Sequence, residues 1–149
     1  MTLSMKIIDL SAGRRAIWYN KTNPLTTFVD VRPEVDPDIV LDTRTDFSHL
    51  GKFDLIVWDP PHMNCGPNSN MGRRYGHWPN AHIRELIKIT QAQATKIAHE
   101  NTLLSLKWNN HDIKLETVFN LMDQWEPLFG HMTKNGPHSQ TFWVMMKLR

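Results

Sequence analysis

Four residues, Asp59, Pro60, Pro61 and His62, directly follow an apolar run at residues 53–58. Two consecutive prolines cannot continue a strand ladder, so the chain should leave a sheet here as a rigid, extended turn. The Asp59 carboxylate and the Pro60 carbonyl would then be fixed hydrogen-bond acceptors at the carboxyl edge of the sheet, where open α/β sheets bind ligands. Two fixed acceptors can hold an NH₂ group. His62 could stack on a planar substrate or accept a proton.

Acidic residues also end two earlier apolar runs. Asp9 closes the first run and is followed by Ser11 and Gly13. A glycine at this point permits a positive φ and lets a ligand lie against bare backbone. Asp30 closes the second run, about twenty residues further on, where dinucleotide-type sites place an acid that accepts both ribose hydroxyls. The alternative for Asp30 is a solvated carboxylate at a strand end.

Short strands alternating with helices must position these residues. Apolar runs and periodic apolar residues predict strands at 5–10, 26–30, 38–41, 53–58 and 101–108 and helices at 80–99 and 112–124. The connections 11–25 and 31–37 leave room for only one short helix and one loop. Two further apolar segments, 125–132 and 141–148, are joined by a turn-forming stretch at 134–137, which predicts an antiparallel hairpin. The alternation indicates an α/β fold with a mainly parallel sheet.

The length and composition predict one domain over residues 1–149. Seventeen Lys and Arg against fifteen Asp and Glu give a net charge of +2, much weaker than a dedicated nucleic-acid binder would show. No apolar stretch has the length of a signal peptide or a membrane span, so we expect no membrane association. The single cysteine, Cys65, fits a reducing cytoplasm. His62, Cys65, His77 and His82 lack the paired spacing of a zinc site, so we predict no metal.

The tetrad Asp59-Pro60-Pro61-His62 resembles the D/N/S-P-P-Y/F/W motif of the amino-methyltransferases, which use S-adenosylmethionine to methylate exocyclic nitrogens of bases or side-chain amides. His62 stands where that family has Tyr, Phe or Trp. The order of elements resembles the class I methyltransferase plan, a Rossmann-like, mostly parallel seven-stranded sheet with an antiparallel last strand, here with trimmed helices. The segments K-W-N and P-L-F-G-H are similar to those of small phage and prophage proteins described as methyltransferases.

This resemblance implies S-adenosylmethionine as the cofactor. Asp9, Ser11 and Gly13 would hold its methionine part, with the ammonium on Asp9 and the carboxylate near the N–H groups of a first helix. Asp30, with Val31 beside it, would hold the ribose.

The resemblance also implies an adenine contact and an acceptor site. Asp42 or Asp46 would receive the adenine amino group, although either acid could instead cap a short turn. Hydrogen bonds to Asp59 and to the Pro60 carbonyl would hold the acceptor amine and stabilise positive charge as it develops on the nitrogen.

Residues 63–80 form a long irregular stretch that carries Arg73, Arg74, Tyr75 and Trp78. Arginines interleaved with aromatics suit a phosphate backbone with stacked bases, so we interpret this stretch as a substrate-binding lid. The alternative is a solvated loop that Tyr75 and Trp78 anchor to the core.

Lys107 and Asn109 close the predicted strand at 101–108 and could touch the acceptor at the same sheet edge. The neighbouring Trp108 and the distant Trp143 could instead be core residues, as aromatics on strands commonly are.

The sequence therefore predicts a cytoplasmic S-adenosylmethionine-dependent methyltransferase acting on an exocyclic amino nitrogen. The first candidate acceptor is adenine N6 in DNA, whose target base must leave the stack. RNA, a free nucleotide or a protein amide are alternatives, and a homo-oligomer could supply sequence specificity. The alternative function is a binding module whose altered glycine turn and His62 have cost it the cofactor or the chemistry.

Overall fold

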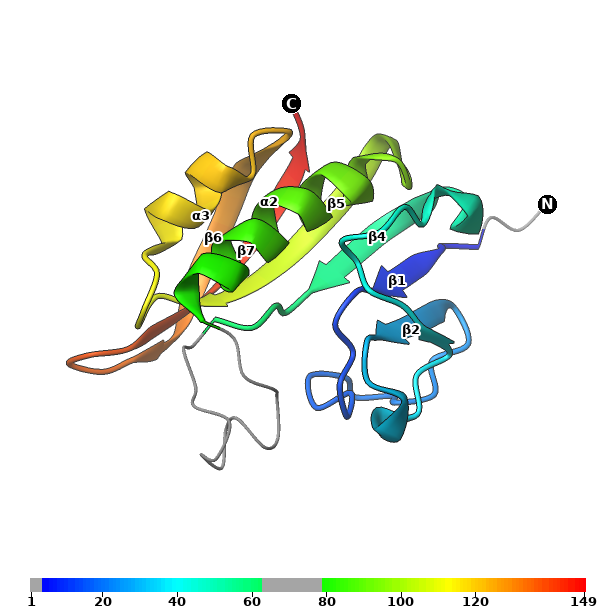
Figure 1. Cartoon of the computed structure of the whole chain (residues 1–149), viewed down its shortest axis with the longest axis horizontal. Coiled ribbons are helices and arrows are strands. Elements are labelled where there is room, and N and C mark those ends of the chain that lie inside the picture. The colour runs from blue at the N-terminus through cyan, green and yellow to red at the C-terminus, as the bar shows by residue number, and fades with distance from the viewer. Residues whose placement is uncertain (1–3, 63–78) are drawn as a thin grey trace.

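A computed structural model describes residues 4–62 and 79–149 (Figure 1). Within these residues, seven strands form one sheet in the order β3-β2-β1-β4-β5-β7-β6. The strands are Ile7–Asp9 (β1), Thr26–Asp30 (β2), Ile39–Val40 (β3), Phe53–Trp58 (β4), Ala98–Asn109 (β5), Trp125–Asn135 (β6) and Gln140–Leu148 (β7). Neighbours pair in parallel except at β7, which runs antiparallel to both β5 and β6. The predicted fold class, including the antiparallel last strand, is confirmed.

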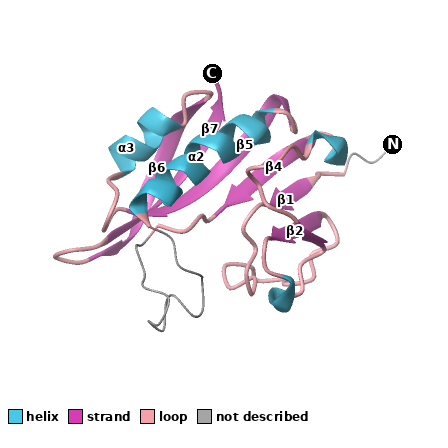
Figure 2. Cartoon of the chain, in the orientation of Figure 1, coloured by secondary structure: helices cyan, strands magenta, loops and turns pink. Residues whose placement is uncertain are grey.

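Two α-helices lie on the same face of the sheet: α2 at Asn80–Thr95 and α3 at Leu115–Leu121 (Figures 1 and 2). The inward side of α2 carries Ile83 and Ile87, which are completely buried. Side chains alternate across a strand, so every second residue of β5 joins the same core. These fully buried β5 residues are Leu104, Leu106 and Trp108.

The first predicted helix, 80–99, is too long at its C-terminal end, because α2 ends at Thr95. Ala98 already pairs with Phe53 in the β4–β5 ladder, and the Ile97 carbonyl accepts the Phe53 N–H at 2.8 Å. Ile97 and Ala98 are apolar and buried in the sheet. Apolar periodicity could not separate a last helical turn from the start of a buried strand.

The second predicted helix, 112–124, is shorter at both ends. Before it, the Ile113 carbonyl accepts the indole N–H of Trp108 at 2.8 Å, which holds that residue outside the helix. After it, the Gln124 backbone N–H donates to the side chain of Gln91 on α2 at 3.1 Å. The indole of Trp125 donates to the Gln91 carbonyl at the same distance. These long-range contacts end the helix where local sequence would continue it.

The short helix expected in the connection 11–25 is absent, and this prediction was wrong. The connection consists of turns, while a single 3-10 turn at Pro33–Val35 occupies the following connection. Gly13 and Arg15 both adopt positive φ, at 53° and 58°, which a right-handed helix does not accept. The side chain of Asn20 then accepts the backbone N–H of Thr22, as asparagines do in turns.

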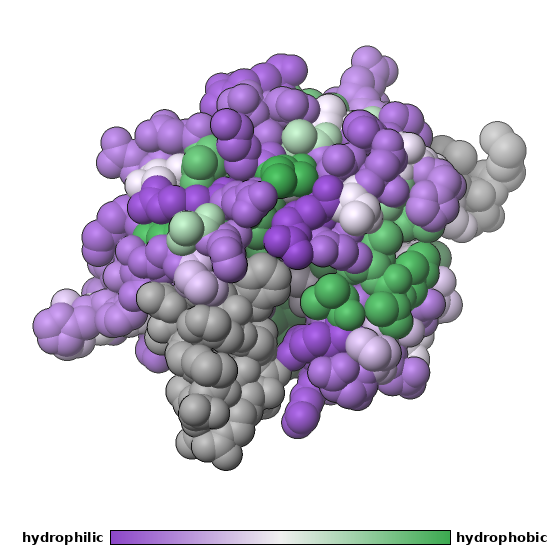
Figure 3. Space-filling view, viewed as in Figure 1, coloured by the Kyte–Doolittle hydropathy of each residue, from purple (hydrophilic) through white to green (hydrophobic). Residues whose placement is uncertain are grey.

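The predicted hairpin is present as β6 and β7, joined by a turn in which the Gly136 N–H donates to the Ser139 carbonyl at 2.9 Å. Pro127 lies within β6, the outermost strand, where a missing N–H costs no inner ladder bond. Figure 3 shows the helix-bearing side as mostly hydrophilic over α2 and α3, with hydrophobic surface toward β1 and β2. Among the described residues, no helix has the length and apolar character to cross a membrane.

Candidate active site

Three acidic residues meet at the carboxyl edge of the sheet. Strand β1 lies between β2 and β4, and all three run in parallel. In this register Asp9 pairs with Phe28 of β2 and with Val57 of β4. Asp30 and Asp59 therefore lie two residues beyond Asp9 on its two neighbouring strands. The sheet order thus brings together the acids that the sequence singled out.

Asp9 is almost fully buried, with 1% of its surface exposed. One carboxylate oxygen accepts the Ser11 N–H at 3.1 Å, and the other accepts the indole N–H of Trp18 at 2.7 Å. Burial raises the pKa of Asp9 to about 6, and the nearby charges of Asp59 and Asp30 add to this effect against the two hydrogen bonds. A carboxylate has about four acceptor positions, so Asp9 can still accept from an ammonium group.

Asp30 is held by Gly13 and Arg32. The Gly13 N–H donates to one oxygen at 2.8 Å, which the positive φ of Gly13 makes possible. The Arg32 backbone N–H and Nε donate to the other oxygen at 3.0 Å, and a terminal nitrogen of Arg32 donates at 3.3 Å. Burial would raise the pKa of Asp30, but these hydrogen bonds outweigh it and hold the pKa below its usual range. The four donors fill the acceptor capacity of Asp30.

Ser11 links the β1 turn to the tetrad that follows β4. Its hydroxyl oxygen accepts the Asp59 backbone N–H at 2.8 Å, while its own N–H donates to Asp9. Lys107 of β5 lies on the far side, with its Nζ 3.5 Å from an Asp59 carboxylate oxygen. Burial raises the pKa of Asp59, and the positive charge of Lys107 opposes that rise. Ser11 therefore holds the Asp59 backbone, and Lys107 attracts its carboxylate.

His62 packs beside the same carboxylate. Its Nδ1 lies 3.3 Å from the Pro60 carbonyl oxygen, and its ring meets Trp108 edge to face with centroids 6.0 Å apart. Burial lowers the pKa of His62, while the charge of Asp59 works in the opposite direction. A neutral imidazole with Nδ1–H donated to Pro60 leaves Nε2 as a proton acceptor. The Pro60 carbonyl keeps a second lone pair for another donor.

The structure separates the two acids that the sequence left as alternatives. Asp42 follows β3 at the carboxyl edge and is bound by Arg44, whose guanidinium donates at 2.8 and 3.0 Å and holds the pKa of Asp42 below its usual range. Asp46 instead pairs with Lys96 at 2.9 Å, just past the end of α2 and next to the start of β5. Asp46 therefore lies at the opposite edge, away from Asp9 and its neighbours.

The remaining candidates differ in their surroundings. Val31, beyond the tip of β2, is 49% exposed at the active edge. Asn109 is buried, and its amide donates to the hydroxyls of Ser139 and Thr141 at 2.6 and 2.9 Å, so it joins β5 to β7. A contact of Asn109 with an acceptor stays a prediction. Trp108 is a core residue, whereas Trp143 is only partly buried. The lid residues Arg73, Arg74, Tyr75 and Trp78 lie outside the described residues.

Sequence reasoning missed two partners of the strand-end acids. Trp18 comes from the turn-rich connection and no local pattern points to it. Arg32 had a visible signal, because Asp30-Val31-Arg32 and Asp42-Thr43-Arg44 share an Asp-x-Arg pattern in which the Arg folds back on the Asp. Among the described residues, no group of three or more His, Cys, Asp or Glu could hold a metal ion.

The strand order, the antiparallel β7 and the acids at the tips of β2, β1 and β4 define the class I methyltransferase fold. No protein-family model matches the sequence, and a search of curated proteins found no match. Similarity is found instead among solved structures.

The chain is similar to a TehB-like S-adenosylmethionine-dependent methyltransferase from Corynebacterium glutamicum, with 14% identity and a TM-score of 0.67 over 100% of this chain and 83% of that one. It is also similar to the N-methyltransferase NodS from Bradyrhizobium japonicum, with 12% identity and a TM-score of 0.66 over 97% and 86% of the chains. TrmN from Thermus thermophilus matches with 12% identity and a TM-score of 0.67 over 97% of this chain. The chain spans only 44% of TrmN.

Proposed function

We propose that this chain is an S-adenosylmethionine-dependent methyltransferase acting on an exocyclic amino nitrogen, with adenine N6 of DNA as the first candidate acceptor and RNA as the next. The observation that carries the proposal is the placement of Asp59 and the Pro60 carbonyl beside Asp9 and Asp30 at one sheet edge. A pair of fixed acceptors for an amine thus adjoins acids suited to a cationic cofactor. The fold of the solved neighbours supports the same reaction class.

The cofactor half of the site is acidic. Asp9 is close enough to Asp30 and Asp59 for their charges to raise its pKa, so a cation bound among them would relieve this repulsion. S-adenosylmethionine, when bound, supplies an electrophilic methyl group on a sulfonium and carries an ammonium. Asp9 has free acceptor positions for that ammonium. At the tip of β2 the exposed Val31 offers an apolar surface for an adenine ring, and Asp42 lies at the same edge.

Asp30 can bind the cofactor ribose only after a side chain moves. Arg32 and Gly13 fill the acceptor positions of Asp30, so two ribose hydroxyls can bind there only when the Arg32 guanidinium moves away. The Arg32 side chain is 23% exposed and lies at the surface, so solvent can receive it.

The acceptor half of the site is formed by Asp59, Pro60 and His62. Asp59 and the Pro60 carbonyl would each accept one N–H of the amine and so aim its nitrogen for in-line attack. Methyl transfer forms an N–C bond as the C–S bond breaks, and the nitrogen then loses one proton. Because burial lowers its pKa, His62 is neutral near pH 7 and can accept that proton. Lys107 would favour the ionised form of Asp59 throughout.

Calorimetry tests the cofactor part of this proposal. We expect micromolar binding of S-adenosylmethionine or of its demethylated product. Asp59→Ala should abolish methyl transfer and leave cofactor binding nearly intact, because Asp59 acts on the acceptor. Asp54→Ala is the matched control, since it removes a carboxylate from the opposite end of the same strand. A silent titration with both compounds refutes the enzyme proposal, and loss of binding in Asp59→Ala refutes the role of Asp59.

Transfer of a tritiated methyl group to DNA, RNA and protein extracts tests the acceptor class. We expect tritium in the DNA, recovered as N6-methyladenine after the DNA is hydrolysed. Label confined to protein would replace the nucleic-acid acceptor by a side-chain amide.

A second candidate function is a binding module that has lost the cofactor. The observation that favours it is that the Arg32 guanidinium occupies the Asp30 carboxylate, which the ribose would otherwise bind. If the chain is a binding module, the wild type should bind no cofactor and Arg32→Ala should gain cofactor binding. If the chain is an enzyme, the wild type should already bind the cofactor. Arg14→Ala, which removes an exposed arginine from the neighbouring turn, is the matched control.

A further inference from the structure

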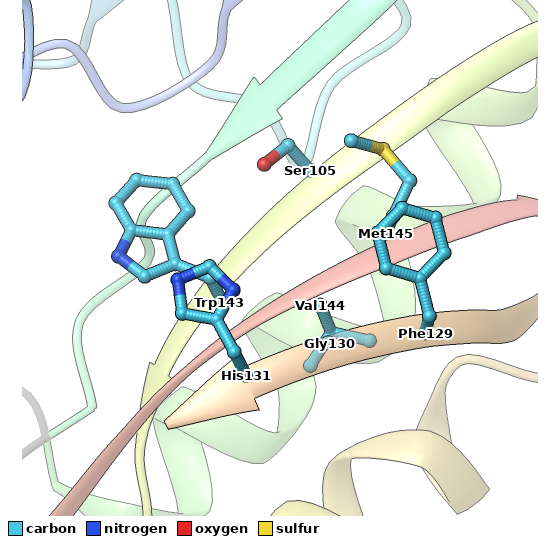
Figure 4. Close-up of a pocket in the computed structure, with 7 residues that line it drawn as sticks. All are labelled: Ser105, Phe129, Gly130, His131, Trp143, Val144 and Met145. Carbon is cyan, nitrogen blue, oxygen red and sulfur yellow. The ribbon is translucent and has the colours of Figure 1, made fainter. Parts of the chain in front are cut away.

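Among the described residues, no helix covers the face of the sheet opposite α2 and α3 along β5, β7 and β6. Strand pairing places two rows of side chains on this face, since the odd-numbered residues of β5 and β7 point away from the buried core. One row runs Ser105, Met145, Phe129, and the next runs Lys107, Trp143, His131. Figure 4 shows Ser105, Met145, Phe129, Trp143 and His131 gathered around one hollow on the three strands. We call these two rows the open face.

The open face is apolar, aromatic and accessible. Its hollow has a volume of about 210 Å³ and is lined by residues of both rows together with Gly130 and Val144. Phe129 is 69% exposed, the highest value for any Phe or Trp among the described residues. The exposed Phe129 ring leaves an apolar surface on which another planar ring could stack.

The open face is continuous with the candidate active site. Lys107 joins the two, because its Nζ lies 3.5 Å from the Asp59 carboxylate and 5.9 Å from the centre of the Trp143 ring. A chain that places one group at Asp59 therefore meets Trp143 next, with His131 and Phe129 on the adjoining strand. The substrate can be longer than the group that reacts.

Positive charge borders the aromatics. At the active-site end Lys107 is paired with Asp59 at 3.5 Å, whereas the strand register puts the exposed Lys134 of β6 on the same face, opposite Thr141. At the other end Glu126 is neutralised by Lys147 at 2.8 Å. Cations beside exposed rings suit a phosphate backbone with stacking bases. A duplex keeps its base faces covered and cannot use the rings in this way.

We propose that the open face binds a single-stranded polynucleotide, with bases stacked on Phe129 and Trp143 and phosphates near Lys134. The proposal rests on the proposed function only in taking the strand as the methyl acceptor, because the face itself needs no cofactor to bind. It narrows the acceptor class to unpaired nucleic acid, in which a target base can be turned out without breaking a base pair.

The test is fluorescence anisotropy with labelled single strands of about twelve nucleotides in DNA and RNA form, and with the matching duplex. The wild type should bind the single strands more tightly than the duplex, and Phe129→Ala should weaken single-strand binding about tenfold. Met132→Ala is the matched control and should bind like the wild type. Met132 is 42% exposed on the same strand but pairs with Phe142, which packs against the buried core on the helix side.

A second variant keeps the proposal testable if Phe129→Ala does not fold. Lys134→Glu changes an exposed charge and should also weaken strand binding, with a smaller dependence on salt. Equal affinity of wild type, Phe129→Ala and Lys134→Glu refutes the proposal. A dimer in sedimentation that Phe129→Ala dissociates, with strand affinity unchanged, also refutes it and makes the face a contact between two copies.

Cofactor calorimetry on the same samples separates this proposal from the proposed function. Strand binding without cofactor binding leaves the open face supported and refutes the methyltransferase. Cofactor binding with methyl transfer, but with no effect of Phe129→Ala on strand affinity, supports the methyltransferase and refutes strand binding by the open face.

Discussion

The buried carboxyl of Asp9 should make the stability of the protein depend on pH in a predictable direction. Burial raises the pKa of Asp9 from 3.8 to about 6 in the folded state. Between these values the folded state holds more protons than the unfolded state, so this group stabilises the fold as the pH falls and destabilises it as the pH rises. Asp9→Asn cannot titrate here. The difference in unfolding free energy between wild type and variant therefore isolates Asp9.

The magnitude follows from the size of the shift. About 2.2 pKa units at about 1.36 kcal/mol each give about 3 kcal/mol in total. About 2 kcal/mol of this should develop between about pH 7.5 and about pH 4.5. The asparagine also loses one of the two hydrogen bonds that Asp9 accepts from Ser11 and Trp18, but that loss is the same at each pH.

Urea unfolding followed by tryptophan fluorescence at several pH values measures this difference. The wild type should gain stability relative to Asp9→Asn as the solution becomes more acidic. A difference that stays constant within about 0.5 kcal/mol would show that the Asp9 carboxyl ionises normally, and the acidic cofactor site argued from its burial would be wrong.

Three further predictions follow from single contacts. Cofactor binding at about pH 6 should release up to about half a proton from Asp9, seen as a binding enthalpy that depends on the buffer; an enthalpy equal in all buffers contradicts the Asp9–ammonium pair. Gly130→Ala should cost about 1–3 kcal/mol in urea unfolding, since the new Cβ collides with the Trp143 carbonyl, whereas Gly136→Ala should be near neutral. Gln91→Leu should cost about 1–3 kcal/mol because the buried Gln91 side chain accepts the Gln124 N–H and donates to Asp123, while Gln93→Leu, which removes a buried oxygen without a partner, should not destabilise.

Strand ends and their acids were predictable because they depend on short-range patterns. A run of apolar residues that closes in Asp, and a pair of prolines that ends a ladder, have the same meaning wherever the strand lies in the sheet. The sequence indicated that Gly13 permits a positive φ, and Gly13 adopts one in the structure. The class of fold followed from the order of such runs.

Contacts between distant segments were not predictable from these patterns. Trp18 reaches Asp9, and Gln91 binds Gln124 and Trp125 over more than thirty positions, so no local signal marks these pairs. The choice between Asp42 and Asp46 also needed the fold, because the ion pair with Lys96 depends on where α2 ends. Apolar periodicity alone extended both predicted helices past the residues at which tertiary contacts end them.

Between β1 and β3 the chain forms turns and one 3-10 helix, and residues of these connections bind the strand-end acids. An α-helix after β1 would offer free N–H groups to a bound anion. Without that helix, the turns themselves must satisfy the buried carboxylates, so Trp18 donates to Asp9 and Arg32 to Asp30. In the proposed cofactor complex, the ammonium would share Asp9 with Trp18, whereas the ribose would have to displace Arg32. Under the proposed function, the free energy of moving the Arg32 guanidinium would lower cofactor affinity, and measuring the affinity of wild type and Arg32→Ala separates the enzyme from the binding module.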